Sequence, residues 1–248
     1  MDTHLDQPPA LKSARSYEEQ DRWIVDAMRD VARQTGQPLR ILEAGCGNRW
    51  PLDMGDTAYH LTGLDLDAAA LELRLKVRRD LDVAIHGDLC TAVLPKAAFD
   101  IVYSGYVLEH IREADLALEN MVGALRSGGL LILRIPDPDT ARALVTRNTP
   151  LAFHVFYYRH VMGRPLAGTP GHAPYETFYH PIISKVGMQR FAVLHALRWR
   201  GLFADEFVRD GKGMLGFCFR AGARLVSAAS FGRFTNRYND LVYLFEKP

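Results

Sequence analysis

Three acidic side chains stand at the ends of short apolar runs, where carboxylates can bind a ligand. Glu43 follows RIL, Asp65 follows HLTGL, and Asp88 follows DVAIHG. If each run is a strand of one parallel sheet, the three carboxylates lie along the same edge. Asp65 can then accept hydrogen bonds from two ribose hydroxyls, and Asp88 can accept one from an adenine amino group. The alternatives are a turn formed by Asp65 and a helix capped by Asp88.

A glycine loop directly follows the first of these runs. Gly45 and Gly47 flank Cys46, and glycine lets backbone N–H groups approach a ligand closely. A dinucleotide-binding loop has a third glycine three residues further on, but Trp50 occupies that position. The loop therefore favours a cofactor that lacks phosphates and has an amino acid as its polar end, over a nicotinamide dinucleotide.

Apolar segments alternate with helical patterns, which predicts a mostly parallel sheet covered on both faces. We expect strands at residues 40–44, 60–66, 82–88, 99–105, 128–136, 202–208 and 240–248. Helices are expected at 16–34, 67–80, 112–126 and 185–199. Ser16 and Glu19 have the spacing of a capping box at the start of the first helix. Tyr17 and Trp23 of this helix are expected to close over the cofactor.

The alternation stops after residue 136. The next 48 residues are rich in proline, glycine and aromatic residues, and they are too many for an ordinary loop, so a lid is expected. The predicted division is a flexible tail at 1–15, a cofactor-binding α/β core at 16–136, a lid or substrate-binding insertion at 137–184, and the C-terminal part of the core at 185–248. Residues 214–231 are either a helix packed on the sheet or an interfacial helix at a membrane surface.

Composition narrows the class of protein. Thirty Lys and Arg residues balance 29 Asp and Glu residues, which argues against nucleic-acid binding. Three separated cysteines form no CxxC pair, so neither a disulfide framework nor a metal site is expected. Neither a secretory signal nor an apolar run long enough to cross a membrane is visible, so we expect a cytoplasmic protein without an integral membrane segment. Residues 190–237 hold nine basic and three acidic residues, which indicates a solvated surface or one facing an anionic substrate, partner or membrane.

Five segments together resemble a known family. ILEAGCGN, LTGLDLD, HGDL, FDIVYSGYVLEHI and LRSGGLLILRIPDP look like the successive motifs of class I S-adenosylmethionine-dependent methyltransferases, in the branch with a VLEHI motif and many small-molecule methylators. The resemblance covers residues 40–136. It implies a three-layer, Rossmann-like α/β fold with seven strands, mostly parallel with an antiparallel last strand. The lid expected from the residues would be an insertion after strand five. It also implies S-adenosyl-L-methionine as the cofactor.

The resemblance assigns a role to each matching residue. Glu43 would reach the methionine amino group, Gly45, Cys46 and Gly47 would line the methionine moiety, Asp65 and Leu66 would hold the ribose and adenine, Asp88 and Leu89 would meet the adenine amine, and Ser104 and Tyr106 would flank the sulfonium. The expected reaction is methyl transfer to a hydroxyl or amine of a small-molecule acceptor, with O-methylation favoured. A sugar, a glycosylated product or a natural-product scaffold would fit.

Residues that would bind the acceptor or take its proton are predicted in two places. One is the start of the helix that follows the fourth strand, and the other is the lid. The candidate general bases are His110, His172 and His180. The alternatives are that His110 orients its loop and that the lid aromatics form a small core. Tyr157, Arg159, Tyr175 and Tyr179 are predicted to bind substrate, because aromatic faces stack on flat rings and arginine binds anions.

The sequence is compatible with three other functions. The chain could be a catalytically silent methyltransferase-like subunit, a nicotinamide-dependent oxidoreductase, or a membrane-surface methyltransferase acting on a lipid-linked acceptor. A homodimer is also left open.

Overall fold

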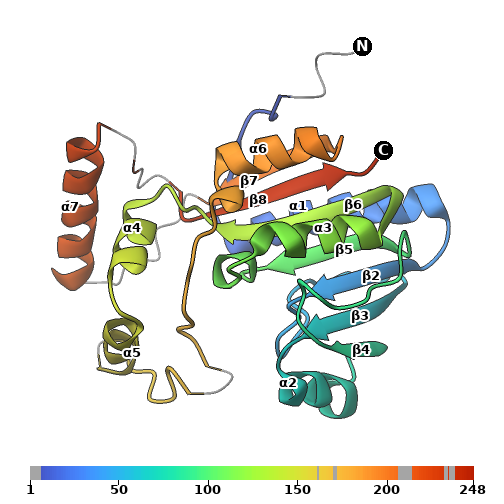
Figure 1. The fold of residues 1–248 in the computed structure, drawn as a ribbon, viewed down its shortest axis with the longest axis horizontal. Helices are drawn as coiled ribbons and strands as arrows, with labels where there is room; N and C mark the ends of the chain where they lie inside the picture. Colours follow the sequence, from blue (N-terminus) through green and yellow to red (C-terminus); the bar gives the residue numbers. More distant parts are fainter. Residues whose placement is uncertain (1–6, 161, 170–171, 206–213, 232–233, 235–237) are drawn as a thin grey trace.

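A computed structural model describes residues 7–160, 162–169, 172–205, 214–231, 234 and 238–248. Eight described strands form a sheet in the order β1-β7-β8-β6-β5-β2-β3-β4 (Figure 1). The strands are β1 Lys12–Ala14, β2 Leu39–Ala44, β3 Tyr59–Asp65, β4 Val83–His86, β5 Phe99–Gly105, β6 Leu125–Pro136, β7 Arg198–Asp205 and β8 Asp240–Glu246. The α-helices are α1 Tyr17–Thr35, α2 Ala68–Glu72, α3 Ala114–Ala124, α4 Ala141–Asn148, α5 Leu151–His160, α6 Lys185–Leu194 and α7 Met214–Ala229. A π-helix, η1 Leu73–Arg78, and two 3-10 helices, η2 Leu108–His110 and η3 Pro181–Ile183, complete the set.

Parallel pairing brings the carboxyl ends of the central strands to one edge. β2 pairs in parallel with β3 and β5, and β5 pairs in parallel with β6. β8 runs antiparallel between β6 and β7, so its first residue, Asp240, lies at the same edge, opposite Pro136. The predicted Rossmann-like sheet with an antiparallel last strand is confirmed.

The sheet has one strand more than the seven predicted. Residues 12–14, expected in a flexible tail, form β1 and pair in parallel with β7, so the prediction is wrong for them. Ala14 is fully buried in this position. Pairing satisfies backbone N–H and C=O groups that β7 would otherwise present at an open edge. A three-residue strand is too short to show alternation in the sequence.

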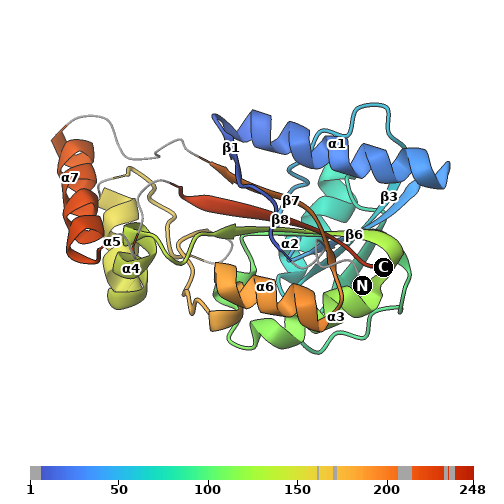
Figure 2. The ribbon, with the colours of Figure 1, turned by 90° about the horizontal axis from the view of Figure 1, so that it is seen from above.

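Helices cover the two faces of the sheet. Figure 2 shows α1 on one side of the sheet and α3 and α6 on the other. Ile24 and Met28 of α1 are fully buried against one face, as are Leu118 of α3 and Met188 of α6 against the other. The spacing of Ile24 and Met28 is that of one helical turn, which is why the sequence predicted this helix.

Helices α4, α5 and α7, called here the outer helices, lie apart from the sheet (Figures 1 and 2). α4 and α5 follow β6, at the place predicted for an insertion. α7 contacts α4, so the prediction that residues 214–231 pack on the sheet, within a C-terminal part of the core, is wrong. None of the described helices is both long and apolar enough to cross a bilayer.

The start of α1 gives a prediction about stability. The Ser16 side chain accepts a hydrogen bond from the Glu19 amide at 3.2 Å, and Glu19 Oε2 accepts one from the Arg15 amide at 2.7 Å. We expect Ser16→Ala to lower the free energy of unfolding by about 1 kcal/mol, because it leaves a helix N–H without its cap. Chemical denaturation measures the change, with Thr91→Ala on an exposed turn as the control. Equal stability of the two variants would contradict the cap.

Candidate functional site

The glycine loop and the end of β3 form one hydrogen-bonded unit. The Gly47 amide donates to Asp65 Oδ2 at 2.7 Å, and the Asp67 amide donates to Asp65 Oδ1 at 2.9 Å. The Gly45 amide donates to the Leu64 carbonyl at 2.8 Å. Asp65 therefore lies at the carboxyl edge of the sheet and holds the loop, instead of pointing into bulk solvent.

Two glycines of this loop have different reasons for being glycine. Gly45 has a φ of 73°, and a Cβ there would lie 2.3 Å from Val107 Cγ2. Gly47 has a φ of 52°, but a Cβ there would meet nothing within 4 Å. The space beside Gly47 is thus open to a ligand. Leu66, next to Asp65, leaves 68% of its surface exposed, which offers an apolar face to a flat ring. An open approach, a carboxylate and an apolar face together fit a nucleoside.

The predicted adenine contacts are less direct. Asp88 is exposed, and its Oδ1 accepts a hydrogen bond from the Cys90 amide at 2.8 Å, which is a turn interaction. Leu89 is buried in the core between the sheet and α3. Binding of an adenine amine by Asp88, with Leu89 beside it, stays a prediction.

Glu43 is paired beneath the loop. Arg74 of η1, fully buried, donates from Nη1 to Glu43 Oε2 at 2.6 Å and to the Cys46 carbonyl at 2.7 Å. Its Nε also donates to Asp80 Oδ1 at 3.1 Å, and Asp80 Oδ2 accepts from the Trp50 amide. Burial raises the pKa of Glu43, although the Arg74 charge opposes the shift. This buried network holds the glycine loop in place from the side of the protein core.

Arg74 had no signal in the sequence. It falls within the helix predicted at 67–80, which the structure divides into α2 and the π-helical η1. α-Helical periodicity does not hold through a π-helical turn, so it gives no reason to expect a buried arginine there. The predicted contact of Glu43 with a methionine amino group stays a prediction.

A second polar cluster lies at the same edge, at the ends of β5, β7 and β8. Asp240 Oδ2 accepts hydrogen bonds from Tyr106 Oη at 2.7 Å and from Tyr17 Oη at 3.1 Å. Asp205 Oδ1 accepts from the Asp240 amide at 2.7 Å. Both carboxylates are buried. Burial, with a smaller effect of the Asp240 charge, raises the pKa of Asp205 to about 6.

Glu109 adds a third buried carboxyl. Its side chain is nearly inaccessible to solvent, and Oε2 has no hydrogen-bond partner among the described residues. Burial raises the pKa of Glu109 to about 8, and the Asp240 charge adds to the shift. The hydroxyl of Ser104, at the end of β5, is also buried and lacks a described partner. Buried polar atoms without partners are uncommon, so they mark a place where a ligand can bind.

Residues 172–180, called here the strap, cross this edge. His110 Nδ1 donates to the Glu176 carbonyl at 2.6 Å, and the Phe178 amide donates to the Glu109 carbonyl at 2.8 Å. The Tyr175 ring meets the His110 ring edge-on at 5.6 Å. Burial, followed by the charges of Asp67 and Asp65, raises the pKa of Tyr175. The strap therefore lies against η2, with Tyr175 close enough to Asp65 and Asp67 for their charges to act on it.

The structure separates the residues predicted to act on the acceptor. His110 lies beside Glu109, and burial lowers its pKa. His180 Nδ1 accepts from the Ile182 amide at 3.3 Å and caps η3, and His172 lies in a turn with Thr169. Tyr175 and Tyr179 belong to the strap, whereas Tyr157 and Arg159 are on α5, among the outer helices. Proton transfer by any of the three histidines stays a prediction.

Sequence reasoning missed three members of the acidic cluster. Glu109 is part of the VLEHI motif, and Asp240 opens the apolar last strand, so their positions were visible but not their convergence. Asp205 was missed because the strand was predicted to continue to residue 208, which placed Asp205 inside the strand and not at its end. Tyr17 donates a hydrogen bond to Asp240 at the same edge, and its closing over the cofactor stays a prediction.

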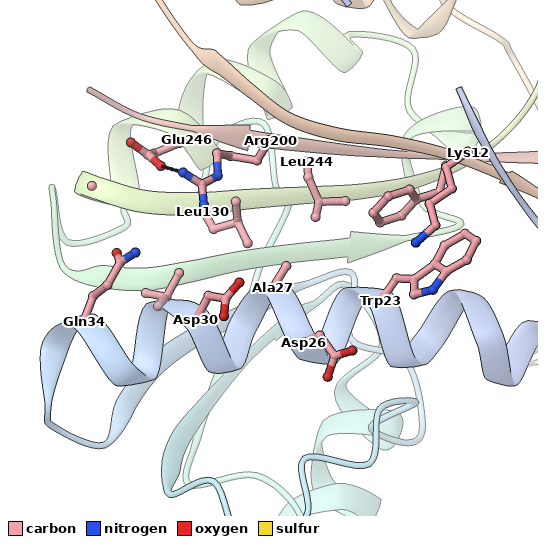
Figure 3. Close-up of a pocket in the computed structure, with 13 residues that line it drawn as sticks. Lys12, Trp23, Asp26, Ala27, Asp30, Gln34, Leu130, Arg200, Leu244 and Glu246 are labelled. Carbon is pink, nitrogen blue, oxygen red and sulfur yellow. Dashed lines mark hydrogen bonds and ion pairs between the residues drawn. The ribbon is translucent and has the colours of Figure 1, made fainter. Parts of the chain in front are cut away.

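The grooves measured on the described surface lie elsewhere. A groove of about 260 Å³ runs between α1 and strands β6 to β8, where Trp23, Lys12 and Leu244 line it (Figure 3). An opening of about 580 Å³ surrounds Pro38 and His60, at the start of β2 and β3. Neither is lined by Glu109, Asp205 or Asp240. We place the site at the carboxyl edge, because ligands of parallel α/β sheets bind there and the unpartnered atoms of Ser104, Glu109 and Asp205 lie there.

Comparison with known proteins gives the chain its relatives. Residues 42–133 match the family described as a methyltransferase domain. A probable S-adenosylmethionine-dependent methyltransferase of Mycolicibacterium smegmatis is 34% identical over 117 residues, which are 46% of this chain and 44% of that protein. The chain thus matches less than half the length of this relative.

Solved structures share the fold at low identity. An S-adenosylmethionine-dependent methyltransferase of Archaeoglobus fulgidus superposes with a TM-score of 0.52 at 12% identity, covering 92% of this chain and 94% of that one. The cyclase SpnF superposes with a TM-score of 0.52 at 16% identity, covering 97% and 89%. At such identities the likeness establishes the architecture.

Glu109 gives a prediction about pH and stability. With a raised pKa, the folded chain keeps a proton that the unfolded chain has released, so stability falls as pH rises from about 4.5 to about 8. Glu109→Gln removes this titration. We expect the wild type to lose on the order of 3 kcal/mol more unfolding free energy than the variant across that range. Denaturation at both ends of the range measures it.

The matched control is Glu113→Gln, whose side chain is exposed. Its pH profile should run parallel to that of the wild type. A parallel profile for Glu109→Gln as well would show that Glu109 has an ordinary environment.

Proposed function

We propose that this chain, a member of the class I S-adenosylmethionine-dependent methyltransferases through its domain at residues 42–133, transfers a methyl group to a small-molecule acceptor. The observation that carries the proposal is the unit of Asp65 and the glycine loop. It places a carboxylate, an open backbone approach at Gly47 and the exposed Leu66 side by side at the carboxyl edge.

The residues of this unit fit S-adenosyl-L-methionine. Asp65 has the chemistry to accept from ribose hydroxyls, and Leu66 offers an apolar face to adenine. Gly45, Cys46 and Gly47 would line the methionine moiety, and Ser104 and Tyr106 would lie toward the reacting end. The bound cofactor supplies a methyl group that its sulfonium already activates.

The acceptor would bind beside Glu109, Asp240 and Tyr106. A hydroxyl or ammonium group loses a proton when it is methylated, and a general base that takes this proton contributes roughly 10²–10⁴-fold. Glu109 suits the role, because one oxygen lacks a partner among the described residues and its pKa of about 8 is close to neutral pH. We assign the step to Glu109 before His110, His172 or His180, because ring nitrogens of His110 and His180 already bind backbone groups.

The strap would exclude water from the reaction. It already contacts the acidic half of the site, through the Phe178 amide on the Glu109 carbonyl and the Tyr175 ring on His110. Closure over bound ligands is a common way to commit them to reaction. The acceptor would then enter while the strap is displaced.

A second candidate is a cofactor-binding protein that transfers no methyl group. The cyclase SpnF shares this fold, and a fold by itself does not determine chemistry. Such a protein would bind the cofactor but would transfer no label to any acceptor.

Cofactor binding is predicted to depend on Asp65. Asp65→Ala should raise the Kd for S-adenosylmethionine by tenfold or more, because a hydrogen bond to a charged group contributes roughly 1.5–3 kcal/mol. Calorimetric titration measures Kd. The control is Asp56→Ala, an exposed carboxylate away from the edge, which should bind like the wild type. Equal affinity of both variants would remove Asp65 from the site.

Methyl transfer is predicted to depend on Glu109. Labelled cofactor and fractionated small-molecule extract, followed by mass spectrometry, detect an acceptor that gains one methylene unit. Glu109→Gln should lower the rate by roughly 10²–10⁴-fold without changing cofactor affinity, since it cannot take the proton. The wild-type rate should rise as pH approaches about 8, whereas Glu113→Gln should match the wild type. An unchanged rate in Glu109→Gln would assign the base elsewhere.

A further inference from the structure

α5 carries an aromatic stripe that faces solvent. Phe153, Phe156, Tyr157 and His160 recur at the spacing of one helix face, and the first three are 54%, 59% and 40% exposed. No residue of this helix is buried. Such a stripe ordinarily packs on a protein core, so an exposed one indicates a contact with something outside the chain.

The opposite side of α5 fixes this orientation. Val155 packs so closely on Gly168 that a Cβ there would lie 2.6 Å from Val155 Cγ2. Arg159 Nε donates to the Ala167 carbonyl at 2.9 Å. These contacts hold the turn after α5 against the helix. The stripe therefore cannot turn inward without breaking them.

Aliphatic side chains extend the exposed apolar surface. Leu151, Met162 and Leu166 around α5 are 40%, 44% and 56% exposed. On α7, Leu225 is 71% exposed, and Phe231 just beyond it is 99% exposed. We call the exposed apolar residues of α5, of the turn after it and of α7 the docking face.

The charge around the docking face is one-sided. Residues 141–169 and 214–231 contain six arginines and no aspartate or glutamate, although acids and bases balance in the whole chain. Those whose side chains the structure describes are Arg147, Arg159, Arg164 and Arg224. Exposed aromatic and aliphatic side chains among positive charges, without negative ones, are typical of surfaces that lie on anionic membranes.

We propose that the docking face binds the surface of an anionic lipid bilayer. The outer helices project beyond the sheet, so they are placed to meet a flat surface (Figures 1 and 2). A second copy of the chain would bring like charges together, which opposes pairing through this face. Single-stranded nucleic acid could stack its bases on the aromatic rings and bind the arginines through its phosphates. It would form no comparable contact with the exposed leucines. This docking does not depend on methyl transfer.

The first test uses the full chain with a reporter in the stripe. Phe156→Trp is mixed with vesicles of phosphatidylcholine alone or with phosphatidylglycerol added. We expect a blue shift of the added indole emission with the anionic vesicles and quenching by brominated acyl chains, because the ring enters the interface. The three native tryptophans serve as the background in the wild type.

The second test separates the apolar and charge contributions by co-sedimentation. Phe153→Ser with Phe156→Ser should lower the vesicle partition coefficient by tenfold or more, since two exposed rings no longer enter the interface. Arg224→Gln should lower it about fivefold. The matched controls are Val93→Ser, 96% exposed in the loop between β4 and β5, and Arg78→Gln on η1, and both should bind like the wild type.

Four outcomes would overturn the proposal. They are no binding to anionic vesicles, equal losses in the controls, binding of single-stranded RNA in place of vesicles, and a dimer in solution that Phe156→Ser dissociates. Arg224→Gln keeps the test decisive if the double serine variant folds poorly.

Discussion

The hydrogen bond between the Gly47 amide and Asp65 joins the two parts of the site that must act together. It couples the end of β3 to the glycine loop after β2, and both strands are fixed in the buried parallel sheet. The loop is held from below by Arg74, whose guanidinium binds Glu43 and the Cys46 carbonyl. Because breaking a buried ion pair costs about 3–5 kcal/mol, the loop has little freedom to leave this position. Cofactor recognition therefore depends on the core as much as on the exposed edge.

The carboxyl edge also gathers several buried charges. Asp205, Asp240 and Glu109 are buried close together, and the Asp240 charge raises the pKa of the other two. Two tyrosine hydroxyls and backbone amides stabilise part of this charge, but Glu109 Oε2 is left without a described partner. Titratable groups shifted in this way cluster at functional sites, where proton transfer near neutral pH requires them.

The sequence predicted the features that depend on local pattern. The apolar runs of the sequence predicted the parallel strands, and the residues after these runs predicted the sheet edge at which Asp65 and Gly47 lie. The sequence could not predict β1, because three residues are too few to show periodicity. This strand forms because β7 would otherwise have an open edge. Arg74 and the convergence of Glu109 with Asp240 depend on contacts between distant segments. The position of α7 was missed for the same reason, since an amphipathic pattern does not say which partner its apolar face meets.

The most direct test of the central claim is a crystal structure of the chain with S-adenosylhomocysteine. The account predicts that Asp65 lies within hydrogen-bond distance of the ribose hydroxyls, that Leu66 contacts the adenine, and that the methionine moiety lies over Gly47. A ligand found in the groove between α1 and β8, with the space beside Asp65 empty, would contradict it.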